Sequence, residues 1–197
     1  MAERALKLVH SRPAPRKREP VLSNGVFGML IFVLSEIMFF MALISAQMVV
    51  RAQTMVWPPA DQPRLPVEQT ALNTGFLLAS GLALYLAGRA FAKDPAKART
   101  PLWASMGLGS LFVGLQGVEW ARLISQGLTL SSSTHGGFFY LIVGLHALHA
   151  VAAILGLGWV TLRVQRGVGT MEQLRTTQVF WAFVVGVWPV IYWQVYL

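Results

Sequence analysis

Five long apolar stretches dominate this sequence of 197 residues. They occupy residues 25–50, 72–92, 102–123, 137–162 and 177–197. Each has the roughly 20 residues that an α-helix needs to cross a bilayer. Because the alternation of period two that is typical of a membrane β-barrel is missing, we predict helices. The predicted fold class is all-α: a polytopic membrane protein whose five transmembrane helices form a bundle.

Composition supports a membrane protein and excludes several other classes. Apolar residues make up 55% of the chain and charged residues 12%, about half the usual charged share of soluble domains. The same apolar content excludes an intrinsically disordered chain. Cysteine is absent, which excludes disulfides, zinc fingers and iron–sulfur clusters with cysteine ligands.

The net charge of +8 fits either a nucleic-acid-binding protein or a membrane protein with basic inner loops. If the N-terminus lies inside, 13 of the 16 Lys and Arg residues fall on the inner side, and only Arg51, Arg64 and Arg122 lie outside. This asymmetry predicts an N-in/C-out orientation and no nucleic-acid partner. We expect residues 1–23 to form a basic cytoplasmic tail and residues 24–197 to form the membrane domain.

One carboxyl lies near the middle of the first predicted helix. A charged Glu36 at that depth would cost roughly 2.5–3.5 kcal/mol on insertion scales, so it must be protonated or find a partner. We favour a functional role, as a proton-linked carboxyl or one that faces lipid or another subunit. The alternative is a protonated side chain hydrogen-bonded to a neighbouring helix.

Four more polar side chains form two pairs on predicted helices. Gln116 and Glu119 share a face of the third helix, and His146 and His149 share a face of the fourth. No other predicted helix carries a histidine that could complete a haem or metal ligand set, so we predict structural polar roles and no metal site.

The residues alone therefore favour an accessory subunit of a membrane complex. The sequence contains no glycine-rich phosphate loop, thiol, nucleophile triad or haem-ligand pair, so we predict no catalytic residue. Two alternatives from other classes remain open: a small transporter that carries protons on Glu36, and a membrane anchor for haem b.

Six local motifs also occur in an informative order. They are SEIMFF (35–40), WPP (57–59), LNTGFLLASG (72–81), LQGVEW (115–120), GLHALH (144–149) and WAFVVGVW (181–188). In sequence and order they resemble motifs of subunit III of haem–copper oxidases, over roughly residues 24–197. The chain resembles the five-span bacterial form of this family, which lacks the first two helices of longer members.

The resemblance implies a cofactor-free, non-catalytic subunit of a cytochrome c oxidase, a proton-translocating enzyme of aerobic electron transport. Such a subunit packs on subunit I, binds phospholipid and supports proton uptake in a bacterial plasma membrane, while subunits I and II hold the haems and copper. It also implies that Glu36 is a buried carboxyl beside a lipid cleft and that Arg163 binds lipid phosphate. His146 and His149 are then not metal ligands. We accordingly expect an anionic phospholipid against the first two helices, with its phosphate near the inner surface.

Two positions depart from the family pattern. Ala182 and Val185 stand where the family has His and Asp, which puts an internal polar role of the last helix in doubt. The departure points to a divergent branch, with an unusual subunit I or a larger supercomplex as partner. Relatives also serve quinol oxidases and accompany nitric oxide reductases, so the electron donor, cytochrome c or quinol, stays open.

Overall fold

The computed structural model describes residues 22–59 and 62–197. The predicted basic tail, residues 1–23, lies almost wholly outside the described residues. The described part is helical and contains no strand. Its long helices are α2 (Asn24–Gln53), α3 (Val67–Phe91), α4 (Arg99–Ser125), α5 (Thr134–Gln165) and α6 (Met171–Ile191). A 3₁₀ turn, η1 (Pro95–Ala98), joins α3 to α4, and a π-helical segment, η2 (Tyr192–Tyr196), extends α6.

Local signals in the sequence explain where the helices begin and end. The Ser133 side chain accepts a hydrogen bond of 3.0 Å from the Gly136 amide and caps α5. Thr170 and Gln173 form a reciprocal capping box at the start of α6. Gly167, with φ of 75°, follows α5 in the left-handed conformation that commonly ends a helix. These caps lie beyond the apolar stretches, which is why the helices extend past the predicted limits.

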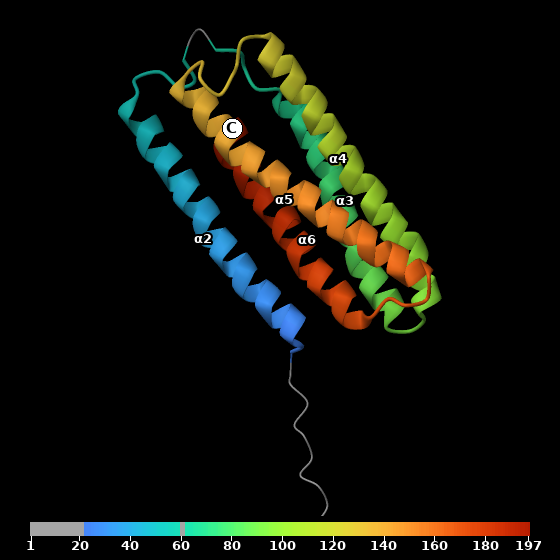
Figure 1. Ribbon diagram of the computed structural model, residues 1–197. Coiled ribbons are helices and arrows are strands. Elements are labelled where there is room, and N and C mark those ends of the chain that lie inside the picture. Colours follow the sequence, from blue (N-terminus) through green and yellow to red (C-terminus); the bar gives the residue numbers. More distant parts are fainter. Residues whose placement is uncertain (1–21, 60–61) are drawn as a thin grey trace, which may run out of the picture.

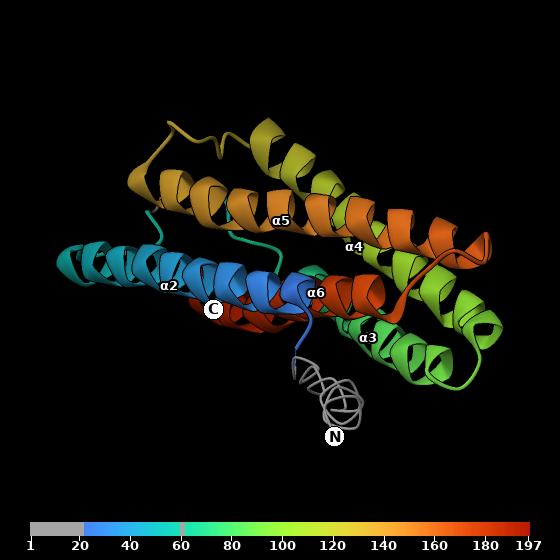
Figure 2. The same ribbon diagram turned by 60° about the horizontal axis from the view of Figure 1, so that its bottom comes forward.

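Helix α6 is the centre of the packing (Figure 1). It contacts α2, α3 and α5, while α4 packs against α3 and α5. Its Trp181 and Trp188 are fully buried, together with Phe40 of α2, Phe112 of α4 and Phe139 of α5. Helix α2 packs mainly on α6, and Figure 2 shows it along one side of the molecule.

The Lys and Arg residues that the structure describes lie at the two ends of the helices, most of them at one end, as the sequence predicted. The links between α3 and α4 and between α5 and α6 lie at one end of the molecule (Figure 1). Helix α2 begins at the same end, where the Gly25 amide donates a hydrogen bond of 3.2 Å to Glu172 Oε1 at the start of α6. We call this the basic end, because it carries Arg89, Lys93, Lys97, Arg99, Arg163, Arg166 and Arg175. The opposite end carries Arg51, Arg64 and Arg122.

Four helices are long and apolar enough to cross a membrane: Asn24–Gln53, Val67–Phe91, Thr134–Gln165 and Met171–Tyr196. Helix α4 contains 27 residues, enough for roughly 40 Å at 1.5 Å per residue. Its glycines and polar side chains make it less apolar than the other four. The prediction of five crossing helices is therefore supported for four of them, and the crossing of α4 stays a prediction.

Candidate functional site

The carboxyl of Glu36 on α2 faces His149 on α5. Its Oε2 atom lies 3.1 Å from His149 Nε2. The Glu36 side chain is 19% exposed and that of His149 is 13% exposed, so both side chains are mostly buried. The tertiary structure thus joins two polar residues that the sequence placed on separate helices.

The hydrogen bonds of His149 constrain where the protons of the Glu36–His149 pair lie. Its Nδ1 atom lies 2.7 Å from the Leu145 carbonyl oxygen, which can only accept, so Nδ1 carries a hydrogen. The contact between Nε2 and Glu36 Oε2 then requires one further proton. That proton resides on the carboxyl or on the imidazole, and in both forms the pair has no net charge. A neutral pair is the form that a membrane interior tolerates best.

Aromatic rings surround the imidazole of this pair. The ring centroids of Phe40, Phe183 and Phe180 lie 5.5, 5.8 and 6.3 Å from that of His149. Phe40 is only 1% exposed. These rings restrict the orientation of the imidazole and keep water from its faces. Chemically, the arrangement can hold a proton at a defined position.

His146 lies one turn earlier on α5 and has different surroundings. It is buried, its ring centroid lies 4.9 Å from that of Trp188, and neither ring nitrogen has a hydrogen-bond partner among the described residues. Of the two histidines, His149 therefore makes an interhelical hydrogen bond, and His146 makes none with the described residues. Within residues 22–59 and 62–197, no group of three or more His, Asp or Glu side chains could hold a metal ion.

Glu119 and Gln116 of α4 belong to a second buried polar cluster. Glu119 Oε2 lies 2.7 Å from Thr70 Oγ1, and its Oε1 accepts from the Tyr196 hydroxyl at 2.8 Å. Gln116 Nε2 donates to that hydroxyl at 3.0 Å. Arg122, three positions after Glu119 on α4, donates to Gln69. The cluster ties α3, α4 and η2 together.

The hydroxyl of Thr70 indicates the protonation of this cluster. It lies 2.9 Å from the Pro66 carbonyl oxygen and 2.7 Å from Glu119 Oε2, yet a hydroxyl has a single hydrogen to donate. Both contacts are satisfied when Glu119 is protonated and donates to Thr70, which in turn donates to Pro66. A neutral carboxyl is also the form that burial favours.

Arg163, the predicted lipid ligand, lies at the basic end of α5. Its Nε donates to Gln173 Oε1 at 3.1 Å, its Nη2 donates to the Val168 carbonyl at 3.3 Å, and its guanidinium lies 5.0 Å from the Trp159 ring centroid. It is 14 positions from His149, or roughly 21 Å along the helix. The structure therefore does not bring Arg163 and Glu36 into one site.

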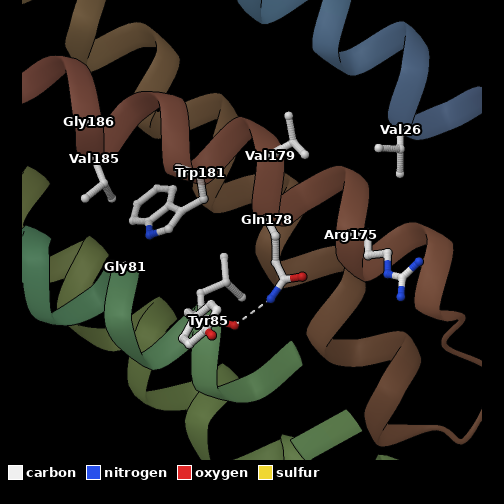
Figure 3. A pocket seen from close by; sticks show the side chains of 11 residues that line it. Val26, Gly81, Tyr85, Arg175, Gln178, Val179, Trp181, Val185 and Gly186 are labelled. Carbon is white, nitrogen blue, oxygen red and sulfur yellow. Dashed lines mark hydrogen bonds between the residues drawn. The ribbon is translucent and has the colours of Figure 1, made fainter. Parts of the chain in front are cut away.

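A groove lies at the basic end, and most of its lining residues were not identified from the sequence. It has a volume of about 480 Å³, its floor is α6, and its walls are α2 and α3 (Figure 3). Arg175 and Gln178 line it toward the basic end, and Gln178 Nε2 donates to the Leu84 carbonyl at 2.8 Å.

Farther along α6, small and apolar side chains line the same groove, and Ala182 and Val185 are among them. Gly186 leaves open space where a Cβ would stand. The departures from the family pattern were the signal that could have located this groove. The sequence could not show that α2 and α3 stand apart over these positions.

Comparisons with known proteins give a consistent result. Over residues 16–197 the chain matches the family described as "Cytochrome c oxidase subunit III". The "Probable cytochrome c oxidase subunit 3" of Nocardia farcinica is 30% identical over 174 residues, which cover 86% of this chain and 85% of that protein. The "Cytochrome c oxidase subunit 3" of Thermostichus vulcanus is 27% identical over 177 residues, covering 87% and 86%. The protein of that name from Strongylocentrotus purpuratus is 30% identical over 190 residues, covering 89% and 71%.

Proposed function

The chain belongs to the cytochrome c oxidase subunit III family, as its motifs predicted, and on this premise we propose that it is the accessory, cofactor-free subunit III of a respiratory haem–copper oxygen reductase. The observation that carries the proposal is the family match over residues 16–197, which includes all five long helices. The relatives are oxidase subunits by name, so the partners are other subunits of an oxidase complex. In this proposal subunits I and II are those partners and hold the haems and copper.

The arrangement in the membrane is part of the same proposal. Five helices cross a bacterial plasma membrane, with the basic end inside and the C-terminus outside. The four apolar helices support the crossing of a membrane. The excess of described Lys and Arg residues at the basic end supports the orientation. The chain covers 85% of the Nocardia farcinica protein and 71% of the Strongylocentrotus purpuratus protein.

Phospholipid binding has support from the groove at the basic end. The groove lies between α2 and α3, the first two helices, and it is apolar apart from its basic-end side chains. There, Arg175 supplies a cation at the level where a phosphate of the inner leaflet would stand. Arg163 keeps its Nη1 atom without a hydrogen-bond partner in the described residues and remains a proposed second phosphate ligand.

Support of proton uptake is the proposed role of the Glu36–His149 pair. The pair holds one proton in a setting with no net charge, and its residual exposure gives it contact with its surroundings. The carboxyl or the imidazole would hold this proton, and the redox chemistry would remain in the partner subunits.

Copurification tests the proposed function. A tagged chain extracted in mild detergent from aerobically grown cells should bring down a haem-containing subunit I in stoichiometric amount. Isolation as a stable haem-free monomer would contradict the proposal. A copper-site motif in the neighbouring subunit II gene would favour cytochrome c as the electron donor, and its absence would favour quinol or a nitric oxide reductase relative.

The two alternatives from other classes predict different results. A proton-linked transporter would change the pH of liposomes that contain this chain alone, and Glu36→Gln would abolish the change. A haem b anchor would show a Soret band in the isolated subunit. We expect neither signal.

A further inference from the structure

Two of the three arginines at the end opposite the basic end converge on one pocket. The pocket has a volume of about 300 Å³ and is lined by Arg51 from the end of α2, Arg64 from the following loop and His135 from the start of α5. Arg122 is not among its lining residues. Lys and Arg are scarce at this end, so the meeting of two arginines in one place does not follow from the orientation signal.

The charged side chains of this pocket make no ion pair within the described residues, and the last residue, Leu197, also lines it. His135 is 2% exposed, and neither of its ring nitrogens has a hydrogen-bond partner. A buried polar group without a partner is costly, and this cost applies to His135, whereas Arg51 and Arg64 are exposed. An anion would satisfy them.

An apolar groove lies along the same two helices whose ends line the pocket. It occupies about 260 Å³ between α2 and α6, and its residues nearest the pocket are Ile44 and Val190. Ile44 precedes Arg51 by seven positions, or roughly 10 Å along the helix. On α6, Val190 precedes the pocket residue Val195 by five positions. The apolar groove therefore begins roughly 10 Å from the cationic pocket, along the same two helices.

The side chain of Trp57 gives the pocket its position relative to a membrane. Its ring meets that of His135 edge to face, with centroids 5.0 Å apart. Tryptophan at the end of a transmembrane helix typically lies at the level of the lipid headgroups. A phosphate bound by Arg51 and Arg64 would lie at that same level, and guanidinium groups match phosphate oxygens with paired hydrogen bonds.

We propose that this pocket binds the phosphate of a phospholipid from the leaflet at the C-terminal end, with an acyl chain along the groove between α2 and α6. The site is separate from the groove at the basic end, because Arg175 lies at the opposite end of α6. Its occupation does not depend on the lipid proposed there.

Lipid retention tests this site. The chain, purified together with the subunits that accompany it, is delipidated in detergent and titrated with phosphatidylglycerol, and bound lipids are counted by native mass spectrometry. Arg51→Gln and Arg64→Gln should each weaken retention of one lipid by about fivefold, the effect expected for a single arginine near a membrane surface. Arg122→Gln is the matched control at the same end and should retain lipid like the unchanged protein.

Further variants keep the test decisive if the glutamine variants assemble poorly. Arg51→Lys and Arg64→Lys keep the charge but lose the paired hydrogen bonds, so they should assemble and still retain less lipid. Arg175→Gln should affect a different bound lipid, and copurification with a haem subunit is scored separately, so this site and the proposed function can fail independently.

Three results would overturn the site. Equal retention in the Arg51, Arg64 and Arg122 variants would show that the pocket does not hold the lipid. Displacement of the lipid by inorganic phosphate at equal concentration would show a site for free anions. A carboxylate of a partner subunit seated on Arg51 and Arg64 in the assembled complex would show a protein contact instead.

Discussion

At the scale of single residues, the membrane carboxyls differ in how they are satisfied. Glu36 shares one proton with the imidazole of His149, whereas Glu119 is enclosed by hydroxyl and amide groups. Neither carboxyl forms an ion pair with a Lys or Arg of the described residues. Both arrangements avoid a net charge among the apolar helices. The sequence analysis predicted this for Glu36, which had to be protonated or to find a partner.

Removal of the Glu36 carboxyl should destabilise the protein. Glu36→Ala leaves His149 Nε2 without a partner, and we expect a loss of about 1–3 kcal/mol. Glu36→Gln should cost less, because its amide nitrogen can donate to Nε2. Unfolding of the purified protein by denaturant in mixed micelles measures both. Glu68→Ala, at an exposed carboxyl on α3, is the control, and an equal loss there would refute the role of the pair.

At the scale of elements, close contacts hold α3, α4 and α6 together. Ser80 and Ser105 each donate to the other's backbone carbonyl, at 2.8 and 2.9 Å, and Trp181 Nε1 donates to Ser80 Oγ at 3.1 Å. The indole lies so close to Gly109 that a Cβ there would stand 2.7 Å from Trp181 Cζ2. Gly109 therefore leaves the space that the Trp181 indole occupies against α4.

Two glycines of α4 provide a matched test of this contact. Gly109→Ala forces the buried indole to move and should cost about 1–3 kcal/mol. Gly107→Ala, two positions earlier, meets nothing within 4 Å, and it should be neutral or stabilise the helix by up to about 1 kcal/mol. Thermal unfolding of both variants gives the comparison. Similar melting temperatures for the two would contradict the close contact between the Trp181 indole and Gly109.

At the scale of the whole molecule, the charges at the two ends predict the orientation in the membrane. Because the chain has no cysteine, a single introduced cysteine is a unique probe on this chain. With the basic end inside, a membrane-impermeant maleimide should label Ser131→Cys in intact spheroplasts. It should label Ala96→Cys only after lysis, although both positions are exposed. Labelling in the reverse order would invert the proposed topology.

Much of the architecture could be predicted from the sequence because it depends on local properties. A run of apolar residues predicts a helix wherever it packs, and short links between helices bring distant arginines to the same end. The six motifs led to the correct family for the same reason, since each is a contiguous segment. The limits of the helices were less accurate, because capping residues such as Ser133 and Thr170 stand outside the apolar runs.

The sites could be predicted only in part. Glu36 and His149 were each singled out, but their pairing across 113 positions was not. Thr70 and Tyr196 were missed as partners of Glu119, and Arg175 was missed as a groove residue. In a soluble helix, one apolar stripe shows which side is buried. These helices are apolar on most sides, so the pattern leaves their contact faces undefined.

The sequence by itself determined the helices, the two charged ends and the family, because helix length, charge and motif order are readable along the chain. Only the tertiary structure decided which polar groups meet and where the helices leave grooves. Those outcomes depend on how the indoles of α6 pack against the small residues of its neighbours. In the folded chain, α2 and α3 line opposite sides of one groove, and Arg51, Arg64 and His135 line one pocket.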